Sequence, residues 1–421
     1  MKDIEKISIG QGINLYILNT DKFKTVSISY CFHRDLDEDY TYNALLPAVM
    51  RRGSKDFKAL KDIERYLEGE YGTIFDVGVQ KRGERHLLRF SVDVINDSFL
   101  PNENAGLVAR GFEFLNSIIN RPVLENGVFK ADYVAQEKQN LKNSIESLIN
   151  DKMGYSIERL IRVMCQDEKY SRYVHGSVED LEKIDAASLY KAYEDVIASS
   201  PLDIFVVGNV DGLDIESIVK NSLDLNKRVV KAIPKPIIKK LIKEPKEHIE
   251  SLDINQGKLN LGFRTGVCPA SEEYYPLAIC SSVFGGGPHS KLFINVREKA
   301  SLAYYAFSRL DSFKGLMLVG AGIDFDNYDV AVDIIKEQFQ DLKSGKITDK
   351  EIDASKKIIT GSMKGIKDQS GRIINYYLGN VIAGRDTTID ESIDRINSVT
   401  LDDVKAVAEK IELDTIYFLK N

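Results

Sequence analysis

The sequence lacks most of the patterns by which a thiolate metal site, a disulfide framework or a membrane segment is recognised. Its four cysteines lie far apart and form no C-x-x-C pair: Cys31, Cys165, Cys268 and Cys280. This spacing favours a reduced protein with incidental thiols over disulfides or a thiolate metal site. No apolar run approaches the roughly 18 to 20 residues that a membrane helix needs, so no transmembrane segment is predicted.

Histidine is also sparse. No two of the five histidines are three or four residues apart, the spacing that would place two imidazoles on one face of a helix: His33, His86, His175, His248 and His289. We interpret each as a surface or turn residue and predict no metal and no other cofactor. A zinc site assembled from residues remote in sequence is the alternative.

The charge balance is acidic. The formal net charge is -7 and the sequence pI is about 5.5, which argues against a nucleic-acid partner because phosphate binding favours a basic excess. The first residues mix acids with bases and show no apolar core before a small-residue cleavage site, so no signal peptide is predicted. We therefore expect a cytoplasmic protein without a membrane partner.

Two stretches of the chain, 212 positions apart, resemble each other. Residues 181–207 and 393–419 match in residue type at many positions without a gap. Each stretch predicts a helix, with Ser188 or Thr400 as its N-cap, followed by a buried strand. The chain is therefore predicted to contain two similar domains.

We predict these domains over residues 1–225 and 249–421, joined by a linker over residues 226–248. The linker contains three prolines and eight Lys or Arg residues, which favours an extended, solvated segment over a helix. An anionic ligand for this basic run is the alternative interpretation.

Strands and helices alternate irregularly in both predicted domains. In the first domain, the residue pattern predicts strands at 14–20 and 26–32 and helices at 42–51 and 58–70. It then predicts a hairpin of 73–80 with 86–94 and a helical stretch over 131–165, interrupted near Asp151 and Gly154. The second predicts strands at 258–266, 302–311 and 316–324. This mixture predicts an α+β fold in which each antiparallel-rich sheet is covered by helices.

The window "VFGGGPHSKLFINVREKASLAYYAFS", residues 283–308, carries a resemblance to a known family. Its glycines lack the spacing of a nucleotide-binding loop and predict a turn that enters a helix. The window resembles the second domain of the pitrilysin/insulinase-type zinc metallopeptidases, the inverzincins. The segments "YSRYVHGSVEDLEKID", "VVGNVD" and "INQGKLNLGF" extend the resemblance over most of the chain. It implies two homologous domains arranged as clam-shell halves.

In that family an HxxEH helix supplies two zinc ligands one helical turn apart, and its glutamate is the general base for the metal-bound water. The matching stretch here is "YNALLPAVMRRGS", which has Ala44 and Ala48 at the ligand positions and Pro47 at the base position. The family's third ligand is a glutamate seven residues after another glutamate. Here Glu137 keeps the first position but Ser144 occupies the second. The resemblance therefore implies a chain without the zinc site.

The second domain keeps the family's other contribution, an arginine and a tyrosine seven residues apart that contact substrate, as Arg297 and Tyr304. A guanidinium can hold a peptide carbonyl or carboxylate through charge-assisted hydrogen bonds. A phenol can donate to the oxygen that becomes negative during hydrolysis. The alternative is structural, with Arg297 in a local ion pair and Tyr304 packed in a strand.

In two-subunit members of this family, one chain carries the zinc helix and the other carries the Arg-Tyr pair. The resemblance implies the second kind of chain: a non-catalytic subunit that processes peptides only with an HxxEH-containing homologous subunit. Such a chain is expected to be inactive alone and able to form a homodimer in isolation. Two other hypotheses are a peptide-binding or scaffold protein with no proteolytic role, and a hydrolase that uses unfamiliar residues.

Overall fold

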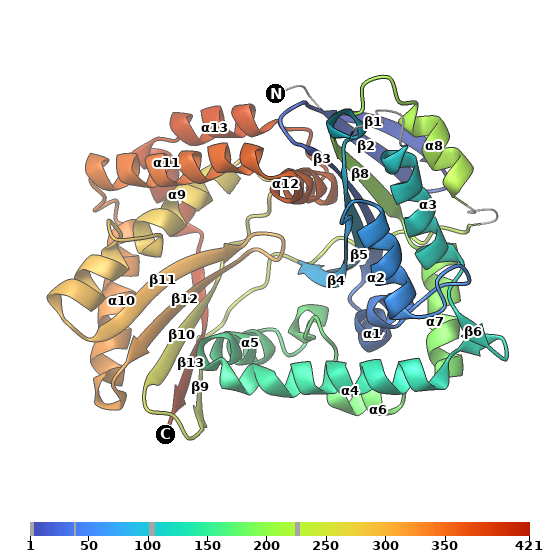
Figure 1. Ribbon diagram of the computed structural model, residues 1–421. Helices are drawn as coiled ribbons and strands as arrows, with labels where there is room; N and C mark the ends of the chain where they lie inside the picture. The colour runs from blue at the N-terminus through green and yellow to red at the C-terminus, as the bar shows by residue number, and fades with distance from the viewer. Residues whose placement is uncertain (1–3, 38, 101–105, 224–227) are drawn as a thin grey trace. The chain divides into compact units, whose positions relative to one another are not determined.

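The computed structural model describes residues 4–421 apart from 38, 101–105 and 224–227 (Figure 1). The chain divides into two compact units. The first comprises Met1–Glu146, Arg172–Pro234 and Gln369–Leu378, and the second comprises Ser147–Ser171, Lys235–Asp368 and Gly379–Asn421. Each unit thus includes a segment from a part of the chain that is remote from its main body.

The first unit is built on a six-stranded sheet with the order β1-β2-β8-β3-β5-β4. Its strands are β1 (Glu5–Gly10), β2 (Ile13–Asn19), β3 (Thr25–Asp35), β4 (Ile74–Arg82), β5 (Arg85–Ile95) and β8 (Leu202–Gly208). Only β2 and β8 are paired in parallel. The predicted hairpin is present as β4 and β5, joined at Gly83, whose φ of 56° suits a tight turn.

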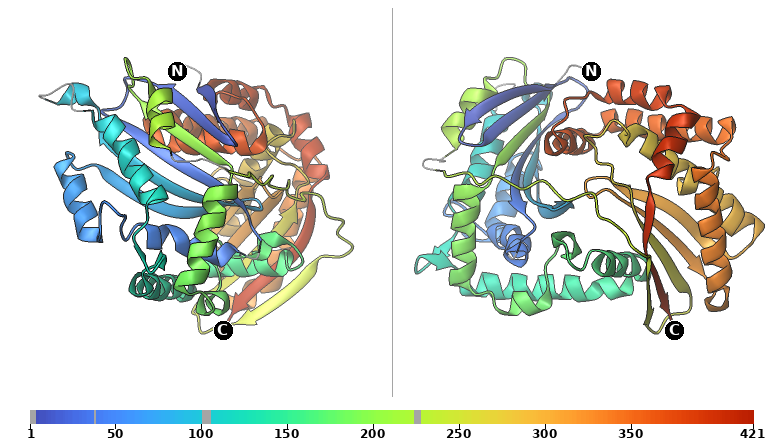
Figure 2. Two further views of the ribbon diagram at one scale, coloured as in Figure 1. Left: turned by 90° about the vertical axis from the view of Figure 1, so that its right-hand side faces the viewer. Right: turned by 180° about the vertical axis from the view of Figure 1, so that it is seen from behind.

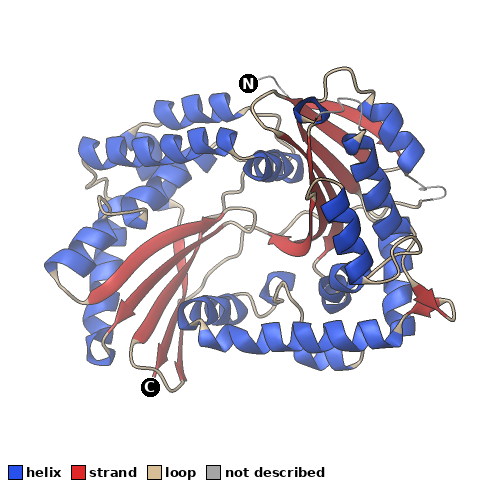
Figure 3. Cartoon of the chain, in the orientation of Figure 1, coloured by secondary structure: helices blue, strands red, loops and turns tan. Residues whose placement is uncertain are grey.

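The first unit also contains helices, some of which pack on this sheet (Figure 3). They are α1 (Tyr40–Met50), α2 (Leu60–Gly69), α3 (Leu107–Asn120), α4 (Ala131–Ser147), α6 (Val178–Glu182), α7 (Ala186–Ser199) and α8 (Ile215–Ser222), with a 3₁₀ turn η1 (Asp97–Phe99) and a small hairpin β6 (Leu124–Glu125) and β7 (Val128–Phe129). Leu45 from α1 and Phe112 from α3 share one core with Phe90 of β5. Burial of such a side chain stabilises the fold by about 1.5–3 kcal/mol, so α1 is held by packing.

The second unit contains a five-stranded sheet with the order β11-β12-β10-β13-β9. Its strands are β9 (Lys246–Ser251), β10 (Gly257–Arg264), β11 (Ala303–Asp311), β12 (Leu316–Ile323) and β13 (Glu412–Lys420). Its helices are α5 (Lys152–Met164), α9 (Tyr274–Gly285), α10 (Tyr328–Lys343), α11 (Asp349–Lys364), α13 (Ile389–Ser398) and α14 (Leu401–Glu409), with the π-helix η4 (Phe293–Lys299) and the 3₁₀ turns η2 (Leu148–Asn150), η3 (Lys169–Ser171), η5 (Phe325–Asn327) and η6 (Gly365–Asp368). The helix α12 (Ser370–Ala383) is divided between the units.

The two sheets repeat one topology. The order β2-β8-β3-β5-β4 in the first unit corresponds to β9-β13-β10-β12-β11 in the second, with one parallel pair followed by three antiparallel pairs in each. Ile204 of β8 lies opposite Tyr30, and its counterpart Ile416 of β13 lies opposite Leu261. The predicted α+β fold with two similar halves is confirmed.

The two copies of the repeat differ at the start of their helices. Thr400 is the N-cap of α14, as predicted, and its hydroxyl accepts a hydrogen bond from the main-chain N–H of Asp403. The prediction for Ser188 is wrong because α7 begins earlier. Asp185 is the N-cap there, and Ser188 is the third helical residue of a reciprocal capping box.

The segment α5 packs on the sheet of the second unit, on the face opposite the main helical layer. Leu261 and Phe263 belong to the core formed with α9 and α10, whereas a Cβ on the intervening Gly262 would lie 2.5 Å from the sulfur of Met164 in α5. Alternate residues of a strand point to opposite faces, so the glycine makes room for α5. The predicted interruption near Asp151 is present, since Asp151 caps α5.

The predicted linker is extended over its described part. Residues 228–243 form no helix or strand, and Figure 2 shows the segment as an open trace that leads into β9. Residues 226 and 227 lie outside the described part of the chain. The last residues of the predicted linker, 246–248, belong to β9 and pair in parallel with β13. Among the described residues of both units, no helix is long and apolar enough to cross a membrane.

Candidate functional site

The helix α1 carries the positions at which the resemblance expects zinc ligands. Ala44 and Ala48 are one turn apart and so lie on the same side of the helix, but a methyl group cannot bind a metal. Pro47 lies inside the helix, where its ring nitrogen has no hydrogen to donate to the carbonyl of Asn43. The helix nevertheless continues, because the N–H of Arg51 donates to the Pro47 carbonyl at 3.0 Å.

The helix α4 carries the position of the third expected ligand. Ser144 is exposed, and its single hydroxyl is a weak substitute for a carboxylate. Glu137 occupies the first position of the family's glutamate pair, and its carboxylate forms an ion pair with a side chain of the same chain. Its carboxylate lies 3.2 Å from the guanidinium of Arg52, and both side chains are largely buried. The Arg52 guanidinium also lies over the ring of Tyr133, 5.0 Å from its centroid.

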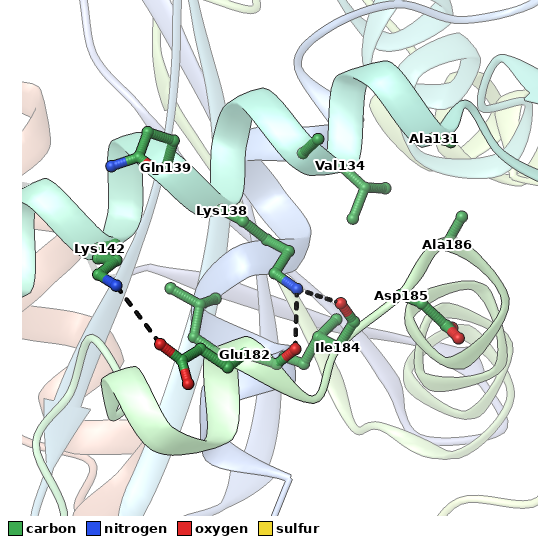
Figure 4. Close-up of a pocket in the computed structure, with 11 residues that line it drawn as sticks. Ala131, Val134, Lys138, Gln139, Lys142, Glu182, Ile184, Asp185 and Ala186 are labelled. Atoms are coloured by element: carbon green, nitrogen blue, oxygen red, sulfur yellow. Dashed lines mark hydrogen bonds and ion pairs between the residues drawn. The ribbon is translucent and has the colours of Figure 1, made fainter.

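A groove of about 420 Å³ follows the same helix where α4 meets the junction of α6 and α7 (Figure 4). Its lining combines apolar side chains, among them Val134, with charged ones. The ammonium of Lys138 donates to the main-chain carbonyls of Glu182 and Ile184, and the ammonium of Lys142 lies 3.4 Å from the Glu182 carboxylate. These contacts join α6 to α4. The two lysines are therefore engaged in contacts within the fold.

The described residues contain no group of three His, Cys, Asp or Glu side chains arranged to hold a metal ion. The histidines are not all at the surface, however. The prediction is wrong for His33 and His86, which are 1% and 0% exposed because both lie in central strands. His33 is 2.8 Å from Asp203, and burial together with the neighbouring His175 lowers the pKa of His86 to about 3.

Arg297 lies in the last turn of η4. The window was predicted to form a helix, and the structure refines this to the wider π-helical winding, which is common at functional sites. The Arg297 side chain is 43% exposed and lies 3.8 Å from Glu298, with its guanidinium 4.7 Å from the centroid of the Phe293 ring. These contacts are local and leave donors of the guanidinium open to solvent.

Tyr304 is the second residue of β11 and lies at a β-bulge. The pairing of β11 with β12 passes from Ala303 to Tyr305 with a shift of register, so Tyr304 has no partner residue opposite it. A bulge redirects a side chain, and Tyr304 is 65% exposed. The alternative in which this tyrosine packs within a strand therefore does not describe it. Among the described residues, no hydrogen bond or ion pair joins Arg297 and Tyr304.

A buried charge cluster in the second unit was not predicted from the sequence. The Glu168 carboxylate lies 2.6 Å from Arg264, 2.7 Å from Lys314 and 3.2 Å from Lys240. Arg264 also pairs with Asp414 at 2.8 Å. Burial alone would raise the pKa of Glu168, but hydrogen bonds from Arg264 and Lys314 lower it to about 2. No spacing in the sequence signals this cluster, because its five members come from five separate segments.

Comparisons with known proteins identify relatives of this chain. A family model described as "Peptidase M16 inactive domain" matches residues 183–359. The "Probable inactive metalloprotease YmfF" of Bacillus subtilis is 38% identical over 410 residues, which span 97% of this chain and 96% of that protein.

Solved structures share the fold over its full length. A conserved protein from Enterococcus faecalis V583 superposes with a TM-score of 0.92 at 31% identity, covering 100% of this chain and 99% of that one. A peptidase M16 inactive domain from Pseudomonas fluorescens superposes with a TM-score of 0.81 at 16% identity, covering 100% and 98%. The chain therefore belongs to the M16, or pitrilysin/insulinase-type, metallopeptidase family, as an inactive, peptidase-like member.

Proposed function

We propose that this chain is the non-catalytic subunit of a heteromeric zinc peptidase. A homologous partner with an intact HxxEH helix would bind the zinc and activate the water, and this chain would supply Arg297 and Tyr304. The observation that carries the proposal is a contrast between two sites. Ala44 and Ala48 leave α1 without ligands, while the arginine and the tyrosine are kept and exposed.

Each of the two side chains suits a distinct task on a peptide. The guanidinium of Arg297 would hold a carbonyl or carboxylate of the substrate with charge-assisted hydrogen bonds. The hydroxyl of Tyr304 would donate to the carbonyl oxygen that gains negative charge as water attacks. Neither group activates water by itself, which is why the chain is expected to be inactive alone.

The substrate in this proposal is an extended peptide, because an extended peptide can pair with the edge of the partner's sheet as an additional strand. We further propose that the complex is cytoplasmic. The surface that accepts the partner would also accept a second copy of this chain, so the isolated subunit would form a homodimer at high concentration.

The first experiment is a native pull-down with this chain as bait, followed by analysis of the recovered complex for zinc and for cleavage of a defined peptide library. We expect a one-to-one partner that contains HxxEH, with cleavage absent from the bait alone. Recovery of the chain by itself, zinc-free and inert but able to bind library peptides, would instead support a peptide-binding or scaffold protein.

The mechanistic part is tested by reconstitution with variants. Arg297→Ala and Tyr304→Phe should each lower peptide cleavage by the complex by about 10- to 1000-fold while the complex still forms. Arg65→Ala and Tyr71→Phe change the same residue types at exposed positions of the first unit and should leave cleavage unchanged. Wild-type activity in both Arg297→Ala and Tyr304→Phe complexes would refute the proposed roles.

A further inference from the structure

The second unit contains a groove of about 580 Å³ that plays no part in the function proposed above. One wall is the extended segment 238–241, which follows Ile237. The other wall is formed by the end of β10, the loop after it and the turn before β13. Lining residues include Lys239, Lys240, Thr265, Val267, Glu273 and Glu412.

The extended wall has an unused hydrogen-bonding edge. Within the described chain, no main-chain N–H or C=O of residues 238–243 makes a hydrogen bond with another main-chain group. Side chains alternate along it: 237, 239, 241 and 243 are exposed, and the residues between them are partly buried. This period of two is that of a β-strand, and an unpaired strand edge is a template for another extended chain.

The wall is fixed in place, so its edge is already arranged for pairing. The fully buried Lys314 donates to the carbonyl of Ile237 at 2.8 Å, and Lys240 pairs with Glu168 at 3.2 Å. Gly315 allows a close approach, since a Cβ there would lie 3.2 Å from the Cβ of Ile238. A segment that is held before binding loses little conformational entropy when a ligand arrives.

The side chains around the edge select the chemistry of the ligand. Most cations of the lining are already paired, since Lys240 and Arg264 are held by the Glu168 carboxylate.

The cation that remains available is Lys239. Lys410 is used by Glu273 at 2.8 Å, whereas Lys239 makes no hydrogen bond or close ion pair within the described residues. Beside it, Leu241 is 82% exposed and Ile237 is 70% exposed. The wall therefore offers an ammonium flanked by two apolar side chains at a spacing of two residues.

We propose that this groove binds an extended peptide segment in which an acidic side chain is flanked, two residues before it and two residues after it, by apolar side chains. The main chain of the peptide pairs with the edge of residues 238–243. A carboxylate of the peptide faces Lys239, and its apolar neighbours cover Ile237 and Leu241. The concave shape favours a peptide over an anionic bilayer, which would share the charge preference but presents a flat surface.

The test uses the full chain and the fluorescein-labelled octapeptide Ser-Val-Thr-Glu-Thr-Val-Thr-Ser, with binding followed by anisotropy. We expect saturable binding, and about tenfold or greater loss with Lys239→Glu, which corresponds to about 1.4 kcal/mol. Lys235→Glu is the matched control, because it makes the same charge change at an exposed residue of the same segment, outside both the groove lining and the paired edge. That variant should weaken binding by no more than about twofold.

Two further probes separate edge pairing from general charge attraction. The same octapeptide with alternate main-chain nitrogens methylated should lose binding, since it cannot donate along one edge, and the octapeptide with Lys in place of Glu should not bind. Equal losses in the Lys239→Glu and Lys235→Glu variants would overturn the proposal. Binding to phosphatidylglycerol vesicles without binding to the Glu-containing octapeptide would overturn it in favour of a membrane surface.

Discussion

The guanidinium of Arg52 lies 3.2 Å from the carboxylate of Glu137, so a salt bridge joins the residues that follow α1 to the helix α4. In HxxEH members of the family, zinc ligands come from helices at these two places. Here Ala44 and Ala48 supply none, and Ser144 replaces the third. At this point α1 and α4 are joined by protein groups.

Arg52→Ala should lower the free energy of unfolding by about 1.5–3 kcal/mol, because it leaves the carboxylate of Glu137 largely buried without its charged partner. Urea unfolding measures the loss. Arg121→Ala is the control, since the Arg121–Asp56 pair is 2.7 Å long but its side chains are 47% and 40% exposed, and such pairs contribute about 0–1 kcal/mol. EDTA should leave the wild-type midpoint unchanged. A lower midpoint in EDTA would mean that a metal supports the fold.

Glu168→Gln should be among the most damaging single substitutions in the second unit. It leaves Arg264 and Lys314 buried without the carboxylate that pairs with both. Removal of one partner from a buried ion pair costs about 3–5 kcal/mol. The matched control is Glu182→Gln, whose carboxylate is 67% exposed and lies 3.4 Å from Lys142.

Addition of Lys314→Met to the Glu168→Gln variant removes the excess positive charge and should recover part of the loss. A double-mutant cycle in urea measures this coupling. Strict additivity of the two substitutions would show that the two residues do not act as a charge pair.

His86 should make the first unit sensitive to mild acid. Its pKa falls from 6.5 to about 3 on folding, through burial first and then the charges of His175, Lys81 and Arg34. The unfolded chain therefore binds the proton more readily below pH 6.5, and stability decreases as the pH falls from there towards about 3.

The expected loss is about 1.4 kcal/mol for each pH unit below 6.5. His86→Gln should remove this part of the slope when the free energy of unfolding is measured from pH 7 to pH 4.5. The same substitution at His248, whose side chain is 42% exposed, is the control. Equal changes of slope in the two variants would show that burial of His86 is not the cause.

The sequence was sufficient to predict features that depend on local pattern. The repeat at an offset of 212 positions predicted two similar halves, and Ile204 and Ile416 occupy equivalent places in the two sheets. The match between α1 and the zinc helix of the family also depends on residues that are close together in the sequence. Periodicity and capping residues act over a few positions, so they can be read without a structure.

Features that depend on distant partners could not be predicted in this way. Glu168 and Arg264 meet although they are 96 positions apart, and nothing near either residue indicates the contact. His86 looks like a surface residue until β3 is paired with β5. The bulge at Tyr304 likewise depends on the register between β11 and β12, which the sequence of β11 alone does not fix.

The effect of Tyr304→Ala on the free energy of unfolding separates a functional role of Tyr304 from a structural one. Because its side chain is 65% exposed, Tyr304→Ala should change the free energy of unfolding by no more than about 0.5 kcal/mol. The contrast within the same unit is Tyr417→Ala, since Tyr417 is fully buried and donates to Glu250 at 3.0 Å, and such truncations cost about 3–5 kcal/mol. Urea unfolding of both variants tests the difference. If Tyr304→Ala destabilised the chain by more than about 1 kcal/mol, a loss of peptide cleavage in a complex would no longer identify Tyr304 as a substrate contact. If Tyr304→Ala leaves the free energy of unfolding unchanged, a loss of peptide cleavage supports a contact between Tyr304 and the substrate.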